Sequence, residues 1–582
     1  MIPMRDGVKL CCIAYVPKNV PGPHPILLER TPYSAGPYGE DFRDMYRQDY
    51  IKAGFILAYE DVRGKYLSQG TFEDVRPELS QHTKPTEVDE STDTADTVAF
   101  LIKHVPDNNG KVGLTGISYP GFYAEMGAIN TPSGLAAVSP QAPVSQWFKG
   151  DDWHHNGVLF LQDAFDFMSW FGTVDPKPSP IHNGISINRH GLSAYDFYLK
   201  TGAMPNFDKD YYKGRIPFWN QVLRHETYDS WWKARAAGPH LKNVSCPMLF
   251  VGGLFDAEDM YGALHSYADA KRQNPHTTVD LVMGPWFHGM WAYGAGSSFG
   301  QLDYGQTTAS WFRKNIELPF FERYLEGKTN VKKIAPVTIY ETGANKWRQF
   351  DQWPPKGATQ NQLFLGPDKE ILPKSSEISG RNEFVNDPAN PTPYLADWST
   401  STHRPTTYMD DDQTWASERK DVLTFESGPL IKDLVMAGPI NVKFWTSTTG
   451  TDEDLVVKVI DVYPSNTEQK NPDGDSMAGK EIMIRGDIMR CKFRHSFTVP
   501  KAMTPGKPTL VSFQLNSVFH DFRPGHRVMI QIQGDWFPLC NRNPNTFTNI
   551  NTAPDSAYHK ATVSLYYGRQ YPSQITFLVL PK

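Results

Sequence analysis

Three side chains whose types and order are suited to nucleophilic catalysis occur along the chain as serine, aspartate and histidine. Ser118 lies in the sequence Gly116-Ile-Ser-Tyr-Pro-Gly121, and Asp256 and His288 follow it. In such a trio the histidine takes the serine proton, and the aspartate orients the imidazole and stabilises its cation. The pattern predicts acyl transfer through a covalent serine ester.

The residues around Ser118 predict a strand, a tight turn and a helix, in that order. Such a nucleophile elbow holds the serine hydroxyl above the end of a sheet. Pro120 departs from the common G-x-S-x-G pattern, but proline suits the first turn of a helix. The backbone N–H of Tyr119 would then be the elbow's donor to an oxyanion. Taken alone, the motif is also compatible with a chance Gly/Ser turn before a helix.

The other two candidates follow predicted strands. Asp256 comes directly after an apolar run over 247–254, and His288 follows another over 278–284. Functional side chains of an open α/β sheet lie on loops that leave the carboxyl ends of its strands. We therefore expect Ser118, Asp256 and His288 to meet at one edge of a sheet.

The chain divides into four stretches with different sequence patterns. Residues 1–145 alternate strands and helices, and this pattern resumes over 241–330. The aromatic-rich stretch 146–240 favours an inserted helical cap, and residues 331–582 favour an all-β domain with short strands and many turns. The predicted fold is an α/β hydrolase domain (1–145 and 241–330) with a helical cap (146–240), plus a C-terminal jelly-roll β-sandwich (331–582).

Individual elements follow from the same patterns. Helices are expected over 41–53 and 87–105. A strand over 337–340 is expected to belong to the all-β domain, and the polar stretch 351–420 is expected to form surface loops.

The amino-acid composition argues against several classes of binding partner. With 40% hydrophobic and 21% charged residues, the 582-residue chain is typical of a soluble globular protein of several domains. The net charge of −6 provides no basic surface for nucleic acid. No apolar run approaches the roughly 18 residues that span a bilayer. We expect neither nucleic-acid nor membrane partners, and no cofactor.

The five cysteines are scattered and form no C-x-x-C pair, so neither a disulfide scaffold nor a metal site is indicated. The first residues already predict a strand, which suggests that upstream residues are missing. A removed export signal would explain this. We therefore expect a periplasmic or secreted protein, while a cytoplasmic location stays open.

Four short motifs carry a resemblance to a known group of enzymes. Gly116–Gly121, Arg30-Thr-Pro-Tyr33, Asp61-Val-Arg-Gly64 and Pro3-Met-Arg-Asp-Gly7 resemble the cocaine esterase / X-Pro dipeptidyl-peptidase group of serine hydrolases. Within that group the chain is most similar to the α-amino acid ester hydrolases, over nearly its whole length. The resemblance implies that Tyr33 donates its hydroxyl to the oxyanion together with the N–H of Tyr119, and that the protein is a homo-oligomer.

The same resemblance assigns a carboxylate cluster. Asp152, Glu258 and Asp259 match the three acids that bind the substrate's ammonium in α-amino acid ester hydrolases. Charge-assisted hydrogen bonds make carboxylates suitable partners for a buried ammonium. Alternatively, Glu258 and Asp259 only cap the helix that is expected to begin near Met260. Trp153 either lines the acyl pocket or packs in the core.

A metal site at Asp151-Asp152 and His154-His155 is not expected, because neighbouring residues rarely face one centre and no third ligand is evident. The predicted function is hydrolysis of α-amino acid esters, and of amides with an α-amino acyl group such as β-lactam antibiotics, with water or an amine taking the acyl group. Aminolysis would make dipeptides. A general carboxylesterase, a glutaryl-type acylase and an X-Pro dipeptidyl-peptidase stay open, as does a non-catalytic carbohydrate-binding protein.

Overall fold

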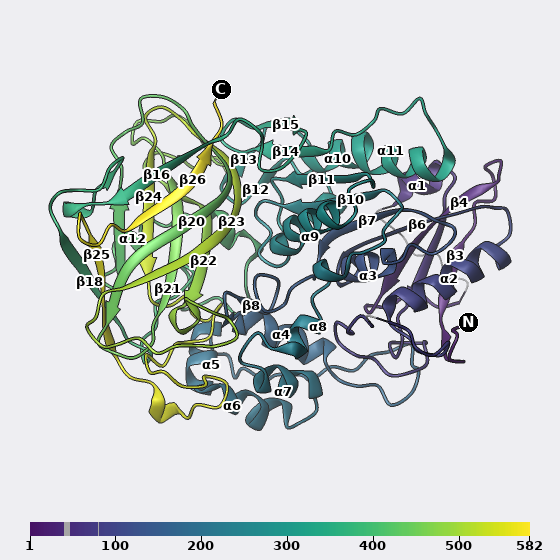
Figure 1. Ribbon diagram of the computed structural model, residues 1–582, viewed down its shortest axis with the longest axis horizontal. Coiled ribbons are helices and arrows are strands. Elements are labelled where there is room, and N and C mark those ends of the chain that lie inside the picture. The colour runs from purple at the N-terminus through teal and green to yellow at the C-terminus, as the bar shows by residue number, and fades with distance from the viewer. Residues whose placement is uncertain (40–46, 80, 582) are drawn as a thin grey trace.

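A computed structural model of the chain describes residues 1–39, 47–79 and 81–581. A mixed α/β part, purple to teal in Figure 1, lies beside an all-β part, green to yellow. Helices α4 to α8 lie at the bottom of this view. No helix in the described part of the chain has the length and apolar character needed to cross a bilayer.

A nine-stranded sheet organises the α/β part, in the order β15-β14-β11-β10-β7-β6-β4-β5-β3. The strands are β3 (Cys12–Tyr15), β4 (His24–Thr31), β5 (Ile56–Asp61), β6 (Asn108–Ser118), β7 (Leu135–Pro143), β10 (Met248–Gly253), β11 (Val279–Gly284), β14 (Val337–Glu341) and β15 (Lys346–Phe350). All pairs from β5 to β14 are parallel, and only the two edge pairs are antiparallel. Strands β4, β5, β10 and β11 are buried at every position, as expected where helices cover both faces of a sheet.

Helices α2 (Glu90–His104), α3 (Tyr119–Ala128) and α9 (Met260–Gln273) pack against this sheet. A capping box of Asp89 and Thr92 starts α2, which satisfies N–H groups that have no partner inside the helix. The predicted helix over 87–105 is confirmed as α2. Of the helix predicted over 41–53, α1 (Gln48–Lys52) is present, and residues 40–46 lie outside the described part.

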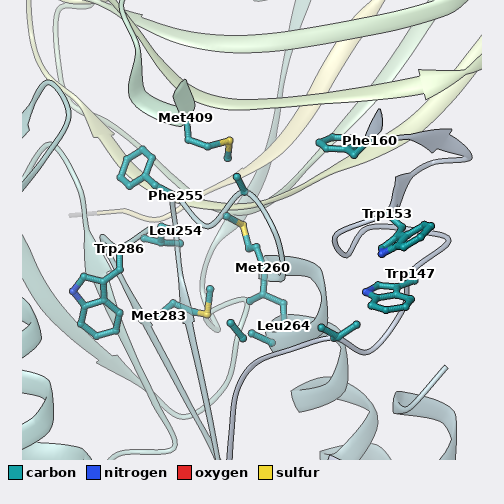
Figure 2. Packing of buried hydrophobic residues seen from close by; sticks show 14 of the residues in the cluster. Trp147, Trp153, Phe160, Leu254, Phe255, Met260, Leu264, Met283, Trp286 and Met409 are labelled. Carbon is teal, nitrogen blue, oxygen red and sulfur yellow. The ribbon is translucent and has the colours of Figure 1, made fainter. Parts of the chain in front are cut away.

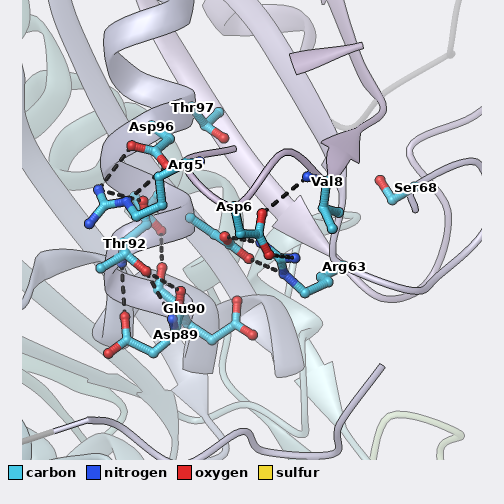
Figure 3. A network of polar contacts seen from close by, with 12 residues as sticks. Arg5, Asp6, Val8, Arg63, Ser68, Asp89, Glu90, Thr92, Asp96 and Thr97 are labelled. Atoms are coloured by element: carbon cyan, nitrogen blue, oxygen red, sulfur yellow. Dashed lines mark hydrogen bonds and ion pairs between the residues drawn. The ribbon is translucent and has the colours of Figure 1, made fainter. Parts of the chain in front are cut away.

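Arg63 joins the N-terminal residues to α2 (Figure 3). Its guanidinium pairs with Asp6 at 2.7 Å and with Asp93 at 2.6 Å, and Arg5 pairs with Asp96 at 2.9 Å. These contacts give a structural role to two of the short motifs, since one supplies Arg5 and Asp6 and the other supplies Arg63.

Short helices are the main regular elements of the stretch 146–240. It contains the hairpin β8 (His154–His155) and β9 (Val158–Leu159), then α4 (Leu161–Phe171), α5 (Ala194–Thr201), α6 (Met204–Asn206), a π-helix (Phe207–Tyr212), α7 (Pro217–Arg224) and α8 (Ser230–Ala234). Most of its aromatic side chains are buried against one another; Phe165, for example, stacks on Tyr212 with ring centroids 4.7 Å apart. They therefore form the core of this stretch.

Two antiparallel sheets build the C-terminal part. One has seven strands, in the order β17-β16-β26-β20-β25-β18 with β23 paired to β20, and the other has the order β19-β24-β21-β22. The strands are β16 (Thr359–Leu365), β17 (Ile371–Leu372), β18 (Gly380–Asn386), β19 (Val422–Glu426), β20 (Leu434–Thr448), β21 (Asp454–Val462), β22 (Glu481–Arg490), β23 (Thr509–Phe522), β24 (Arg527–Gln533), β25 (Ala561–Tyr567) and β26 (Gln574–Val579). In β20, Ile440, Val442 and Phe444 point into the core with the period of two.

Two expectations for the boundary between the parts are wrong. The strand at 337–340 is β14, which pairs in parallel with β11 in the α/β sheet and carries β15 as its antiparallel edge. An apolar, alternating stretch indicates a strand but not the partner of that strand. The polar stretch 351–420 is not all surface loop, because it contains β16 and β18.

Candidate active site

Ser118 lies at a sharp turn between β6 and α3. Its backbone has φ 68° and ψ −128°, a conformation that side-chain-bearing residues seldom adopt. Such strain persists only where the surrounding structure enforces it, and it concentrates at functional sites. The predicted layout of strand, turn and helix is therefore present.

Gly116 lets this turn fold back on itself. A Cβ atom at Gly116 would overlap the backbone carbonyl of Pro120, in the first turn of α3. No flexible side chain can move aside there, because the obstacle is backbone.

We expect Gly116→Ala to destabilise the protein by about 1–3 kcal/mol, the usual cost of overpacking, and to displace Ser118. Thermal melting and the rate of Ser118 labelling by a phosphonate would measure both effects. Gly428→Ala is the control, since Gly428 is exposed with open space around its Cβ position. Equal melting temperatures for the two variants would contradict this account of the turn.

Asp256 and His288 meet as their positions after β10 and β11 predict. The Nδ1 atom of His288 lies 3.0 Å from Oδ2 and 3.2 Å from Oδ1 of Asp256. The backbone N–H groups of Glu258 and Asp259 donate to Asp256 Oδ1 at 2.8 and 3.1 Å. With Nδ1 as the donor to Asp256, Nε2 is the atom that can accept a proton.

The charges around His288 favour its protonated form. Burial opposes that form, but the nearby charges of Asp256, Glu258 and Asp152 raise the pKa of His288 to about 10. Burial likewise opposes the charge of Asp256, while the imidazolium and the two backbone N–H groups lower the pKa of this carboxyl. Both shifts favour the charged forms of the pair, and Nε2 of His288 lies 3.4 Å from Glu258 Oε2.

A cavity of about 480 Å³ opens beside these groups. It is lined by Tyr33, Ser118, Asp152, Trp153, Asp163, Ala164, Asp166, Phe167, Trp170, Glu258, His288 and Arg404. Most of the predicted site residues are among them. Asp256, Asp259 and Tyr119 lie directly behind this lining, so the structure brings all of the predicted site residues together.

The two predicted oxyanion donors flank Ser118. Tyr33 and Ser118 line the same cavity, and burial followed by the charge of Asp152 raises the pKa of Tyr33, so the phenol keeps its proton. Tyr119 is the first residue of α3, where backbone N–H groups have no partner within the helix. Its phenol donates to Asp74 at 3.0 Å and accepts from the N–H of Val75 at 2.8 Å, which fixes its position.

Hydrogen bonds hold Asp152 in place next to Glu258. The backbone N–H of Asp152 donates to the carbonyl of Glu258 at 2.9 Å, and Trp147 Nε1 donates to Asp152 Oδ2 at 2.9 Å. Burial, and then the charge of Glu258, raises the pKa of Asp152 to about 7. Any cation placed between these two carboxylates would lower that pKa and be held strongly.

Asp259 has no exposed surface, and neither of its carboxylate oxygens has a hydrogen-bond partner among the residues that the structure describes. Burial, and then the charges of Asp152 and Asp151, raises the pKa of Asp259. Asp259 occupies the N-cap position of α9, but its side chain makes no capping hydrogen bond. The helix-cap alternative is therefore wrong for Asp259.

Trp153 both packs in the core and lines the cavity, while a role in binding the acyl group stays a prediction. It is almost fully buried and packs on Trp147 and Phe218, each with ring centroids 5.4 Å away, yet it also lines the cavity. Figure 2 shows Trp147 and Trp153 lying against each other.

The neighbouring histidines face other groups. His154 contacts the carbonyl of Trp147, and His155 contacts Asp487 of the β part. Asp151 instead accepts backbone N–H groups from Ser145, Gln146 and Gly262. Within the described ranges no three His, Cys, Asp or Glu side chains are arranged to hold a metal ion.

Sequence reasoning missed Arg404. It comes from the all-β part, yet its Nε donates to Asp163 Oδ1 at 2.7 Å and its Nη2 pairs with Glu258 Oε1. Arg404 lies 146 residues from Glu258 within a polar stretch, where no periodicity or motif distinguishes it. Only the folded arrangement of the two parts identifies this residue.

A serine at a strained strand–helix turn, with a His–Asp pair at the carboxyl ends of neighbouring parallel strands, defines a serine hydrolase of the α/β-hydrolase type. Comparison with known families agrees. The family described as X-Pro dipeptidyl-peptidase (S15 family) matches residues 6–290, and its C-terminal non-catalytic domain matches residues 329–576. The chain belongs to this S15 family.

Relatives match over the whole chain. An aminopeptidase from the marine sediment archaeon Thaumarchaeota archaeon is 35% identical, with a TM-score of 0.92 covering 100% of this chain and 96% of that one. An α-amino acid ester hydrolase is also 35% identical, with a TM-score of 0.91 covering 100% and 95%. The cocaine esterase of Rhodococcus sp. (strain MB1 Bresler) is 24% identical, covering 100% and 98%.

Proposed function

We propose that the protein hydrolyses esters and amides of α-amino acids, with the substrate's free ammonium held by Asp152, Glu258 and Asp259. The observation that carries this proposal is the buried Asp259 carboxylate, which lacks a hydrogen-bond partner among the described residues and lies next to two further acids beside Ser118. A buried carboxylate without a partner is costly. An ammonium group would offset that cost.

Ser118, His288 and Asp256 carry out the chemistry in this proposal. Ser118 Oγ forms a bond to the substrate carbonyl carbon while His288 Nε2 takes the hydroxyl proton. The resulting oxyanion accepts hydrogen bonds from the N–H of Tyr119 and the hydroxyl of Tyr33. When the tetrahedral intermediate breaks down, the bond to the leaving alcohol or amine breaks and His288 returns the proton to it.

Water then releases the acyl group by the same steps in reverse order, with His288 taking its proton. An amine can replace water, which would make dipeptides or β-lactam antibiotics with an α-amino side chain. The acyltransferase activity therefore uses the same acyl-enzyme as hydrolysis.

Binding of the substrate's ammonium also shifts His288 toward the neutral form that acts as the base. In the free enzyme, the carboxylates near His288 raise its pKa. A substrate cation beside Asp152 and Glu258 opposes that effect, because like charges disfavour one another. Binding of the correct substrate therefore lowers the pKa of His288 and favours the neutral imidazole that takes the serine proton.

The relatives support this substrate class. Two are named an aminopeptidase and an α-amino acid ester hydrolase, and both names imply a substrate with a free α-amino group. A glutaryl-type acylase is disfavoured, since the carboxylate of its acyl group would be repelled by the acids of the pocket. A general carboxylesterase or X-Pro dipeptidyl-peptidase would use the same three catalytic residues.

We also propose that residues 146–240 act as a cap over the site and that the two C-terminal sheets form a jelly roll. The helices that carry part of the pocket wall support the cap, and the two antiparallel sheets support the jelly roll. Homo-oligomeric assembly and a periplasmic or secreted location stay predictions.

Asp152→Asn tests the proposed function. With norleucine methyl ester and its des-amino analogue, methyl hexanoate, the parent should prefer the amino ester in kcat/KM. The variant should lose about 10- to 100-fold of that preference, because one charged partner of the ammonium is removed.

The control is Asp166→Asn, which removes another carboxylate from the cavity wall. Asp166 already pairs with Arg189 and with the hydroxyl of Tyr198, so its loss should leave the amino preference nearly unchanged. A parent without the preference, or an Asp152→Asn variant that keeps all of it, would exclude the ammonium site.

A further inference from the structure

Arg404 reaches the substrate cavity from the opposite part of the molecule. Its side chain is 12% exposed and bridges two acids, Asp163 on α4 and Glu258 beside His288. Burial opposes its charge, but Asp163 and Glu258 raise the pKa of Arg404, so it stays a cation. The guanidinium thus lies permanently within the wall of the cavity.

Cationic side chains lie next to most of the acids in and behind this wall. Arg404 pairs with Asp163 and Glu258, and Arg189 pairs with Asp166. Asp152 and Asp259 lie near His288 and pair with neither arginine: Asp152 accepts a hydrogen bond from Trp147, and Asp259 Oδ2 lies 3.9 Å from His288 Nδ1. Because both lie close together, they form one place for one substrate cation.

Each further acid in the described wall, namely Asp163, Glu258 and Asp166, already pairs with an arginine. Helix α4 contributes Ala164, Phe167 and Trp170 as an apolar surface next to Asp163. A substrate side chain that extends past the ammonium therefore meets apolar atoms and the guanidinium of Arg404. A positive charge at its end would face a like charge, which is unfavourable in a partly buried site.

We propose that Arg404 is a specificity-determining residue: its single positive charge offsets part of the negative charge of Glu258 and Asp163, and so disfavours acyl groups that carry a second positive charge besides the α-ammonium. This inference rests on the proposed function, since it assumes that the ammonium lies at Asp152, Glu258 and Asp259. It predicts that lysyl and arginyl esters are discriminated against by a residue of the β part.

The test compares two esters of equal chain length, lysine methyl ester and norleucine methyl ester, at pH 7. In the parent, kcat/KM should favour norleucine. In Arg404→Gln, two carboxylates lose their cation, and the ratio of kcat/KM for lysine over norleucine should rise about tenfold or more. Arg404→Lys keeps the charge and should keep the parent ratio to within about threefold.

A merely structural role for Arg404 would lower both kcat/KM values together and leave their ratio unchanged. If Arg404→Gln does not fold, the double variant Arg404→Gln/Asp163→Asn replaces it, because it leaves only Glu258 without its cation. Its ratio should also rise, by less than in the single variant. If the ratio of kcat/KM for lysine over norleucine is unchanged in whichever of these variants folds, the inference is wrong.

Methyl hexanoate separates the two proposals. If the parent does not prefer norleucine methyl ester to methyl hexanoate, the ammonium site itself is wrong. If that preference is present but the ratio of lysine to norleucine does not respond to Arg404→Gln, only the role of Arg404 is wrong.

Discussion

Ser118→Ala is expected to lower kcat by about 10⁶-fold, the loss seen when the nucleophile of a serine hydrolase is removed. Alanine leaves the oxyanion donors and the carboxylates in place, so substrate binding should persist. The effect should therefore appear in kcat rather than in affinity. Steady-state kinetics on norleucine methyl ester, with mass spectrometry after treatment with a serine-reactive phosphonate, would measure it.

Ser169→Ala is the matched control. Ser169 lies on α4, where its hydroxyl donates to the backbone carbonyl of Asp166, and its loss should leave activity and labelling intact. Phosphonate labelling of the Ser118→Ala variant, or turnover within about tenfold of the parent, would show that another residue is the nucleophile.

Asp256→Asn is expected to lower kcat by about 10⁴-fold, because an amide can hold the imidazole in the wrong tautomer. The substitution should also shift the pH dependence of the activity. Burial opposes the raised pKa of His288, and the charge of Asp256 is the largest of the effects that raise it to about 10. Without that charge the pKa falls, so the residual activity should reach its plateau at lower pH than in the parent.

The measurement is the pH dependence of phosphonate labelling, which needs no charged substrate. Asp269→Asn is the control, since Asp269 pairs with Arg272 on the outer side of α9. A variant whose labelling rate rises over the same pH range as the parent's would contradict the assignment of Asp256 as the partner of His288.

Much of the site could be predicted because it follows from local patterns. Asp256 and His288 each come directly after a buried apolar run, and parallel strands bring their carboxyl ends to one edge of the sheet. Ser118 is indicated by the glycine two residues earlier and by the helix that follows. These features are encoded within a few residues of each functional side chain, so a single sequence is enough to find them.

The rest depends on contacts between distant segments. The stretch at β14 reads as a strand, but its pairing with β11 is decided by the fold and not by its own residues. That Asp259 has no hydrogen-bond partner among the described residues depends on everything packed around it. Arg404 could not be found because the distance along the chain from Glu258 carries no information about the distance in space.

The bridge from Arg404 to Asp163 and Glu258 has a consequence for how such enzymes diverge. The reactive serine and its histidine are inherited with the first half of the chain, but one charge in the pocket is inherited with the second half. Recombination between relatives near residue 350 would keep the chemistry and exchange the segment around Arg404. Acyl preference could then change in one genetic event, without any substitution near Ser118.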